Sequence, residues 1–243
     1  TYIGPGVGGG IFSPALANVG THTIFYAFTD PATGCTDSCT FLIRVNPLPI
    51  VTCPPADTVC IDAPVFTLVG GLPTGGDYSG TGVTNNEFDP AAATAGTHTI
   101  VYTFTDPNGC TDTCQFTITV NPLPVVTCPP ADTVCIDAAV FTLTGGLPGG
   151  GDYSGTGVTN NEFDPSVGAG TYTIVYAFTD PNGCTDTCQF TITVNPLPVV
   201  TCPPNDTVCI DAPAFALTGG APAGGTYIGP GVGGGIFSPA LAN

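Results

Sequence analysis

The cysteines are the residues of this chain with the clearest capacity for covalent chemistry. The sequence contains 12 cysteines but only 2 histidines, and no pair of cysteines is spaced as CxxC. Zinc sites and thioredoxin-type redox sites usually need that spacing or more histidine, so structural disulfides are the simpler interpretation. Disulfides persist in oxidising compartments, and we therefore expect an extracellular or cell-surface protein.

Four cysteines recur at nearly the same spacing in two stretches of the chain: Cys53, Cys60, Cys110 and Cys114, then Cys128, Cys135, Cys184 and Cys188. Four cysteines allow three pairings. A strand would hold Cys110 and Cys114 about 13 Å apart, too far for a bond without a tight turn. We expect a nested pairing, in which Cys60 bonds Cys110 and Cys53 bonds Cys114, with Cys135–Cys184 as a counterpart. Free thiols or a metal site are the open alternative.

Asp106, Asn108 and Asp112 place three side-chain oxygen donors within one loop, where they could coordinate calcium. No glutamate closes the loop as in an EF-hand. Asp and Asn beside Pro107 and Gly109 also fit a turn in which their side chains accept backbone hydrogen bonds. The turn is favoured and calcium stays open; we predict no cofactor.

The two histidines, His22 and His98, occupy equivalent positions in repeated sequence, where a third copy has Tyr172. A histidine that tyrosine can replace serves packing better than catalysis. No serine, cysteine or carboxylate lies in a recognisable catalytic motif, and the glycine strings do not form a phosphate-binding loop. The sequence therefore predicts that the protein is not an enzyme.

The chain is strongly acidic, since one basic residue faces 18 acidic residues for a formal net charge of −17. Nucleic-acid binding needs a basic surface, which this composition excludes. Only 8% of the residues are charged, while 42% are hydrophobic and the chain has 34 glycines and 26 prolines. This composition favours short strands and many turns. No apolar run of about 18 residues predicts a membrane span in this segment.

Internal repeats set the predicted domain organisation. The string NPLP begins at Asn46, Asn121 and Asn195, so the copies are 121 − 46 = 75 and 195 − 121 = 74 residues apart. We divide the chain into an opening segment (residues 1–46, the C-terminal part of a module), a first repeat (47–121), a second repeat (122–195) and a closing segment (196–243, the N-terminal part of a module).

The sequence also repeats with a longer period, equal to three modules. Residues 1–18 are identical to residues 226–243, an offset of 226 − 1 = 225 residues, or three modules. We expect the sequence to be an excerpt of a longer array, in which residues 199–243 of one copy and the opening residues of the next build one sandwich. The nested rule then predicts Cys202–Cys39 and Cys209–Cys35 bonds across the junction. Strand exchange between separate subunits is the alternative, and neither half-module should be ordered alone.

Within each module the hydrophobic residues alternate with polar ones. From Cys114 to Val120 one face carries Cys, Phe, Ile and Val, and Thr97 to Phe104 alternates in the same way. Such alternation is typical of half-buried strands, and Asp106 to Gly109 is a turn sequence between them. No stretch shows a helical period. We predict an all-β chain of tandem, disulfide-braced β-sandwich modules of immunoglobulin type, each of about 75 residues.

The blocks YSGTGV, FDP, TFTDPNGC and TITVNPLP together resemble the immunoglobulin-like repeats of long surface and secreted adhesins of Bacteroidetes-type bacteria. The resemblance covers essentially the whole chain. It implies an exported structural or adhesive array without a catalytic site. Two cysteines per module, matching Cys60 and Cys110, belong to that pattern, so Cys53 and Cys114 depart from it and indicate extra bracing.

Asp57-Thr58-Val59 recurs at Asp132 and Asp206. The triplet resembles the O-glycosylation acceptor of the same bacteria, and its place after Pro-Pro suggests an exposed loop; the predicted acceptors are Thr58, Thr133 and Thr207. The alternative is a turn before the next strand.

The leading functional hypothesis is a structural extracellular filament or stalk whose partners are neighbouring modules or other copies of itself. The prolines of each NPLP linker favour an extended connection, and near-identical modules argue for a shared mechanical role. The alternative is a multivalent adhesin that binds a glycan or a cell-surface protein through every module.

Overall fold

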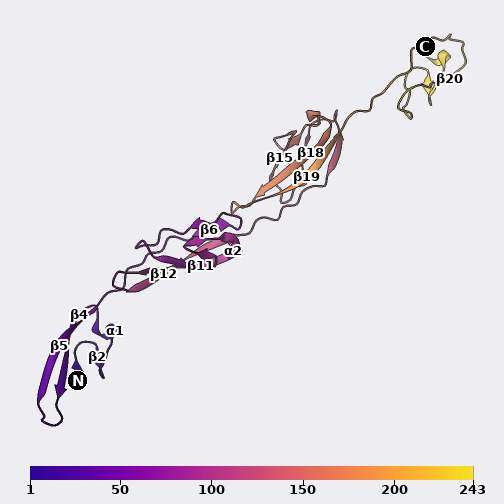
Figure 1. Ribbon diagram of the computed structural model, residues 1–243. Coiled ribbons are helices and arrows are strands. Elements are labelled where there is room, and N and C mark those ends of the chain that lie inside the picture. Colours follow the sequence, from indigo (N-terminus) through magenta and orange to yellow (C-terminus); the bar gives the residue numbers. More distant parts are fainter. Residues whose placement is uncertain (243) are drawn as a thin grey trace. The chain divides into compact units, whose positions relative to one another are not determined.

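A computed structural model describes residues 1–242 of the chain, and nearly all of its regular structure is β (Figure 1). The all-β prediction is therefore confirmed. The chain divides into two compact units. Unit 1 comprises Thr1–Val125 together with Thr179–Asp186, and unit 2 comprises Val126–Phe178 together with the residues from Thr187 onwards.

The first repeat forms two sheets within unit 1. The larger has the order β6-β12-β11-β8, and the smaller has the order β7-β10-β9. The bounds are β6 Asp57–Cys60, β7 Phe66–Thr67, β8 Asp77–Ser79, β9 Val83–Thr84, β10 Glu87–Phe88, β11 Gly96–Thr105 and β12 Thr111–Asn121.

The long hairpin of β11 and β12 is the centre of the larger sheet. The strands are antiparallel and stay in register from Gly96 opposite Val120 to Thr105 opposite Thr111. Their turn closes where the N–H of Gly109 donates to the carbonyl of Asp106 at 2.9 Å. The predicted alternation is confirmed, because every second residue of each strand points to the buried face.

The core lies between the two sheets. Phe88 of β10, Ile100 of β11 and Ile118 of β12 are at most 1% exposed and belong to one cluster. Removing such side chains from water contributes roughly 1.5–3 kcal/mol each. This cluster fixes which face of each strand points inward, because a slip of one residue would expose all three.

Tyr102 locks the larger sheet to the loop before β8. Its hydroxyl donates to the carbonyl of Pro73 at 2.5 Å and accepts from the N–H of Gly76 at 2.9 Å. Its ring lies against Gly71 and Gly76 so closely that a Cβ on either glycine would lie 2.6–2.7 Å from ring atoms. Only glycine fits at these two positions while the ring is in place.

Four short helices were not expected from the sequence: α1 Pro14–Ala17, α2 Pro90–Ala93, and the 3₁₀ helices η1 Pro165–Val167 and η2 Pro239–Leu241. One turn is too short to show a helical period. A local signal was present in FDP, because Asp89 accepts hydrogen bonds from the N–H groups of Ala91 and Ala92 and proline follows it.

The opening segment also lies in unit 1. It consists of β1 Tyr2–Ile3, β2 Val7–Gly8, β3 Ile11–Phe12, β4 Gly20–Thr29 and β5 Thr36–Val45. The sheet order is β1-β4-β5, so one edge of β5 is unpaired among the described residues (Figure 1). The β4–β5 pairing is local in the chain; that neither half-module is ordered alone stays a prediction.

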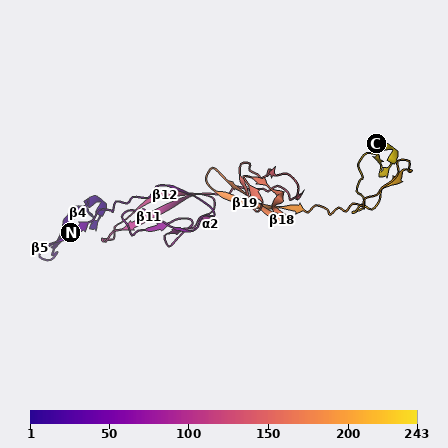
Figure 2. The ribbon, with the colours of Figure 1, turned by 90° about the horizontal axis from the view of Figure 1, so that it is seen from above.

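The second repeat builds the same two sheets. They have the orders β13-β19-β18-β15 and β14-β17-β16, and β18 and β19 lie side by side in both views (Figures 1 and 2). The bounds are β13 Asp132–Cys135, β14 Phe141–Thr142, β15 Asp152–Ser154, β16 Val158–Thr159, β17 Glu162–Phe163, β18 Gly170–Thr179 and β19 Thr185–Asn195.

The closing segment, in unit 2, has little regular structure. Its only strands up to residue 242 are β20 Phe215–Ala216, β21 Val232–Gly233 and β22 Ile236–Phe237, in the order β20-β22-β21. They correspond to the smaller sheet of a repeat, and the strands of the larger sheet are absent from the described part of this segment.

Replacing Tyr102 by Phe tests the lock described above. The change leaves the Pro73 carbonyl and the Gly76 N–H without their partner, which should cost about 1–3 kcal/mol of unfolding free energy in denaturant titration of the full chain. Tyr26→Phe is the matched control: Tyr26 holds the equivalent position on β4, and its hydroxyl has no hydrogen-bond partner among the described residues. Equal effects of the two substitutions would contradict the lock.

Candidate functional site

The first feature of the cysteine network is a bond inside each repeat. Cys53 bonds Cys114, and Cys128 bonds Cys188, with Cα–Cα distances of 5.7 Å in both. The bonds tie the segment before the first strand of the larger sheet to the middle of its longest strand. This half of the expected nested arrangement is present in both repeats.

The second feature is a bond between repeats. Cys60 bonds Cys184, 124 residues away, with a Cα–Cα distance of 5.6 Å. The predicted Cys60–Cys110 and Cys135–Cys184 bonds are therefore wrong. Cys184 lies in the turn between β18 and β19, and this turn is the part of the second repeat that belongs to unit 1.

The reason for the error is the direction of β6. The nested pairing assumed that the start and end of a module run in opposite senses, but β6 pairs with β12 in parallel, with Cys60 opposite Asn121. Cys110 precedes the other end of β12, which is 11 residues long. At about 3.3 Å per residue, Cys60 and Cys110 lie some 35 Å apart along the strand.

The turn that carries Cys184 is fixed by Asp180. The Asp180 carboxylate accepts from the N–H groups of Asn182 and Cys184, both at 2.9 Å, and the Asp180 N–H donates to the carbonyl of Cys184 at 2.9 Å. The side chain of Cys184 is 1% exposed. The turn thus presents the sulfur in one fixed position.

The equivalent turn of the first repeat contains the residues considered for calcium. Asp106 accepts from the N–H groups of Asn108 and Cys110 at 2.8 and 2.9 Å. Hydrogen bonds from the Asn108 side chain and the Cys110 N–H hold the pKa of the Asp106 carboxyl below its usual value. Asp112 accepts from the N–H of Thr113. Residues 1–242 contain no cluster of three or more His, Cys, Asp or Glu side chains suited to a metal.

Six of the predicted disulfide cysteines have free thiols in this structure. They are Cys35, Cys39, Cys110, Cys135, Cys202 and Cys209. Cys110 and Cys135 have the same local surroundings as the bonded Cys184 and Cys60, since the same turn holds Cys110 and the same parallel pairing holds Cys135 at the end of β13.

The predicted glycosylation sites lie on a strand and not in a loop, at least in the two repeats. Thr58 is in β6 and Thr133 is in β13, because both strands pair with a long neighbour. Both threonines are exposed, as is Thr207. Each preceding aspartate accepts from the N–H of its threonine at 2.7–2.8 Å and leaves the hydroxyl open to solvent.

The histidines serve local packing. The ring nitrogens of His22 and His98 bond the carbonyls of Asn18 and Thr94 at 2.9 Å. The Tyr172 hydroxyl donates to the carbonyl of Gly168 in the same way. Histidine and tyrosine thus make the same contact at this repeat position.

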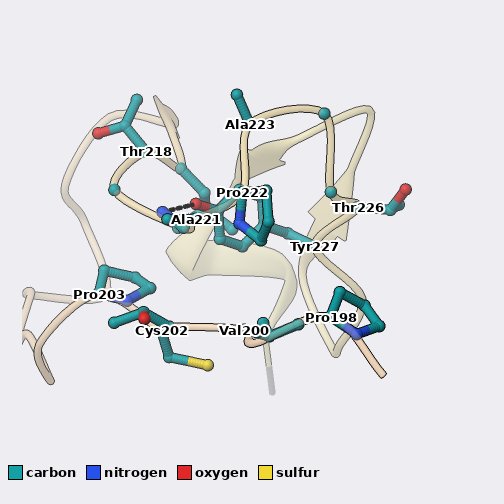
Figure 3. Close-up of a pocket in the computed structure, with 16 residues that line it drawn as sticks. Pro198, Val200, Cys202, Pro203, Thr218, Ala221, Pro222, Ala223, Thr226 and Tyr227 are labelled. Carbon is teal, nitrogen blue, oxygen red and sulfur yellow. Dashed lines mark hydrogen bonds between the residues drawn. The ribbon is translucent and has the colours of Figure 1, made fainter. Parts of the chain in front are cut away.

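The closing segment contains a hollow of about 600 Å³ (Figure 3). Figure 3 shows Val200, Cys202 and Pro203 along one wall, with Pro222 and Tyr227 facing them. The hollow was not expected from the sequence, although its glycines and Pro222 repeat those that surround Tyr102. Its wall includes Cys202, which has a free thiol.

The chain is similar to several known proteins. Residues 47–120 match the HYR domain family. Hyalin of the sea urchin Strongylocentrotus purpuratus is 30% identical over 210 residues, covering 77% of this chain and 17% of that protein. Hyalin of Lytechinus variegatus is also 30% identical, covering 76% of this chain and 38% of that protein. The chain thus spans well under half the length of either relative.

Solved structures with partial likeness include a calcium-stabilised adhesin with which an Antarctic bacterium binds ice, at 19% identity and a TM-score of 0.34, covering 75% of this chain and 60% of that one. Another is Sidekick-1 immunoglobulin domains 1–4, at 10% identity and a TM-score of 0.27, covering 74% and 59%. The hyalins do not support the bacterial origin that the sequence blocks suggested.

The disulfides and the similarity to hyalin show an extracellular or cell-surface protein. Among residues 1–242, no helix is both long enough and apolar enough to cross a membrane.

A serine at Cys60 tests the bond between repeats. Closing a loop of 124 residues is worth about 5 kcal/mol in the chain-entropy model, so Cys60→Ser should lower the melting temperature of the dilute, oxidised full chain. Cys110→Ser is the matched control and should change it little, because Cys110 has a free thiol. If Cys60 were instead bonded to Cys110, both substitutions would lower the melting temperature by the same amount.

Proposed function

We propose that the chain is a stretch of a non-catalytic extracellular filament or stalk, built from immunoglobulin-like repeats with boundaries at residues 46/47, 121/122 and 195/196. The observation that carries the proposal is the Cys60–Cys184 bond, which joins one repeat to the hairpin turn of the next. Such a bond couples the two repeats mechanically, as a load-bearing filament requires.

The bond changes how tension passes along the chain. With Cys60 and Cys184 joined, a pull on the two ends follows the chain to Cys60, crosses the sulfurs and leaves at Cys184. The whole core cluster of the first repeat lies in the bypassed loop, whereas β6 and β19 lie outside it. A covalent bond therefore carries force that would otherwise separate β11 from β12 and open the core of the first repeat.

Small repeats need this bracing. The core cluster has seven buried residues in the first repeat, Phe88 and Ile100 among them, and six in the second. Domains of this size bury a smaller fraction of their surface than larger domains, and disulfides commonly compensate. Residues 1–242 bury no polar or charged side chain, which favours a structural role over catalysis.

The relatives support the same class of function. The similarity to the HYR domain and to hyalin indicates an extracellular repeat protein of the adhesion type. A multivalent adhesin is the alternative. It is favoured by the recurrence of the same exposed side chains in each repeat, Thr58 and Thr133 among them, because a weak site repeated along a chain gains avidity.

Single-molecule stretching from both termini tests the load-bearing role. In the oxidised chain only about 60 residues before Cys60 and about 60 after Cys184 can extend, which at roughly 3.4 Å per residue is about 400 Å. Reduction should double this length to about 800 Å. The triple variant Cys53→Ser, Cys60→Ser, Cys128→Ser is the control and should extend like the reduced chain.

Extension of the oxidised wild type to the full length would contradict load transfer through the sulfurs. Saturable binding of a glycan by the oxidised chain, lost when Thr58 and Thr133 are replaced together, would favour the adhesin.

Thr58, Thr133 and Thr207 remain our proposed glycosylation sites. Their exposed hydroxyls support the proposal. Peptide mapping of material from the native source should show hexose-type mass on these three threonines and none on Thr97, a matched threonine exposed on β11. Unmodified peptides at all three positions would exclude glycosylation of these threonines.

A further inference from the structure

The outer face of the larger sheet is made almost entirely of threonine in both complete repeats. In the first repeat, alternate residues of β11 and β12 point away from the core, because Ile100 and Phe116, which alternate with them, are buried. From Thr97 to Thr105 and from Thr111 to Thr119, ten side chains lie on this face. They are Val101, Gln115 and eight threonines, Thr97, Thr99, Thr103, Thr105, Thr111, Thr113, Thr117 and Thr119.

These threonines form four cross-strand pairs: Thr97–Thr119, Thr99–Thr117, Thr103–Thr113 and Thr105–Thr111. In the first and last of these pairs the two hydroxyls hydrogen-bond each other, at 3.2 and 2.8 Å. The four hydroxyls of the middle pairs have no hydrogen-bond partner in the part of the chain that the structure describes. They can therefore bond a molecule that lies on the face.

The second repeat carries the same face on β18 and β19. Its ten outward side chains are Val175, Ala177, Gln189 and the seven threonines Thr171, Thr173, Thr179, Thr185, Thr187, Thr191 and Thr193. Hydroxyl pairs again lie at both ends, Thr171–Thr193 at 3.3 Å and Thr179–Thr185 at 2.7 Å. We call these two sets of ten side chains the threonine faces.

The stability of the sheet explains the threonines only in part. Threonine packs well on a pleated surface, and cross-strand threonine pairs are stabilising. The chain has 18 acidic residues, yet all ten side chains of each threonine face are uncharged. Asp77 of β8 lies beside Thr103 at the edge of the sheet and accepts a hydrogen bond from the Asn86 side chain at 3.2 Å. The chain thus keeps its negative charge away from the faces.

We propose that a second copy of this chain packs on the threonine faces, sheet against sheet. A hydroxyl both donates and accepts a hydrogen bond, so a threonine face is its own complement. The side chain is branched at Cβ and has few rotamers to lose when it is covered. Two chains of net charge −17 also approach with least repulsion where neither presents a charge.

The shape of the surface favours another sheet over a small ligand. Ligand sites are usually concave and bury most of the ligand, whereas two sheet faces pack against each other about 10 Å apart. The aromatic rings of the hairpin, Tyr102 and Phe116, point into the core and are not offered to a ligand on this face.

The area of the threonine faces sets the strength of the association. A side chain covers roughly 33 Å² of a sheet face, which is the strand spacing of about 4.8 Å multiplied by two residue rises of about 3.4 Å. Two faces of ten side chains each therefore bury roughly 650 Å² in contact. Specific, stable interfaces bury at least about 1,200 Å², which the faces of two repeats together reach. Association therefore needs more than one repeat, as a tandem array provides.

The proposal deepens the proposed function and rests on it, because packing between copies would bundle filaments through a named surface. The two can fail separately. The stretching experiment measures single chains and does not depend on association.

Analytical ultracentrifugation of the oxidised full chain tests the association. The free thiols are blocked with iodoacetamide, and chains without glycan are selected by mass because Thr58 and Thr133 lie beside the faces. We expect the wild type to associate reversibly as its concentration rises. Added salt should strengthen the association, because it screens the repulsion between the acidic chains.

Thr99→Asp combined with Thr173→Asp places one carboxylate in each threonine face. Packing would then bury an unpaired charge, so the dissociation constant should rise at least tenfold. Gln115→Glu combined with Gln189→Glu adds the same charge with almost no change in shape, and we expect the same direction. The melting temperature of each variant shows that it is folded.

Thr81→Asp combined with Thr156→Asp is the matched control. Both threonines are exposed in the turns before β9 and β16, where aspartate is well tolerated, so the same charge is added away from the faces. The control should change the dissociation constant less than twofold.

A wild type that stays monomeric up to roughly 1 mM would overturn the proposal, as would equal weakening by the face and control substitutions. A monomeric wild type that binds a soluble glycan, and loses it with Thr99→Asp and Thr173→Asp, would assign the faces to a glycan instead.

Discussion

The parallel pairing of β6 with β12 is the constraint on which the covalent structure depends. It places Cys60 beside Asn121, at the end of the repeat that leads into the linker, and away from Cys110. Cys60 therefore cannot bond Cys110 of its own repeat, but it can bond Cys184 in the turn of the next repeat. If β6 were antiparallel to β12, Cys60 could bond Cys110. Each repeat would then be closed by its own disulfides and would not be joined to the next.

The disulfides within the repeats and the disulfide between them have different roles. Cys53–Cys114 and Cys128–Cys188 hold each repeat's first segment against its longest strand, where a small core needs help. Cys60–Cys184 joins successive repeats. The Tyr102 lock completes the larger sheet with hydrogen bonds to a loop in which glycine is required at two positions.

Much of the fold could be predicted from the sequence, because period-two alternation and turn residues are local signals. They located β11, β12 and the Asp106–Gly109 turn, and the repeat spacing showed that modules recur. The direction of β6 could not be predicted, because four residues of Asp-Thr-Val-Cys pair equally well in either sense. The Cys60 partner depended on that direction. The Tyr102 lock was missed because its glycines lie far from it in the chain.

The most direct test of the account is the identity of the residue bonded to Cys60 in the oxidised protein. Aspartate-specific digestion under non-reducing conditions places Cys53, Cys60, Cys110 and Cys184 on separate peptides, and tandem mass spectrometry then identifies the linked pairs. We expect one peptide pair that contains Cys60 and Cys184, with Cys53 linked to Cys114. A pair containing Cys60 and Cys110 would contradict it, because each repeat would then be closed upon itself.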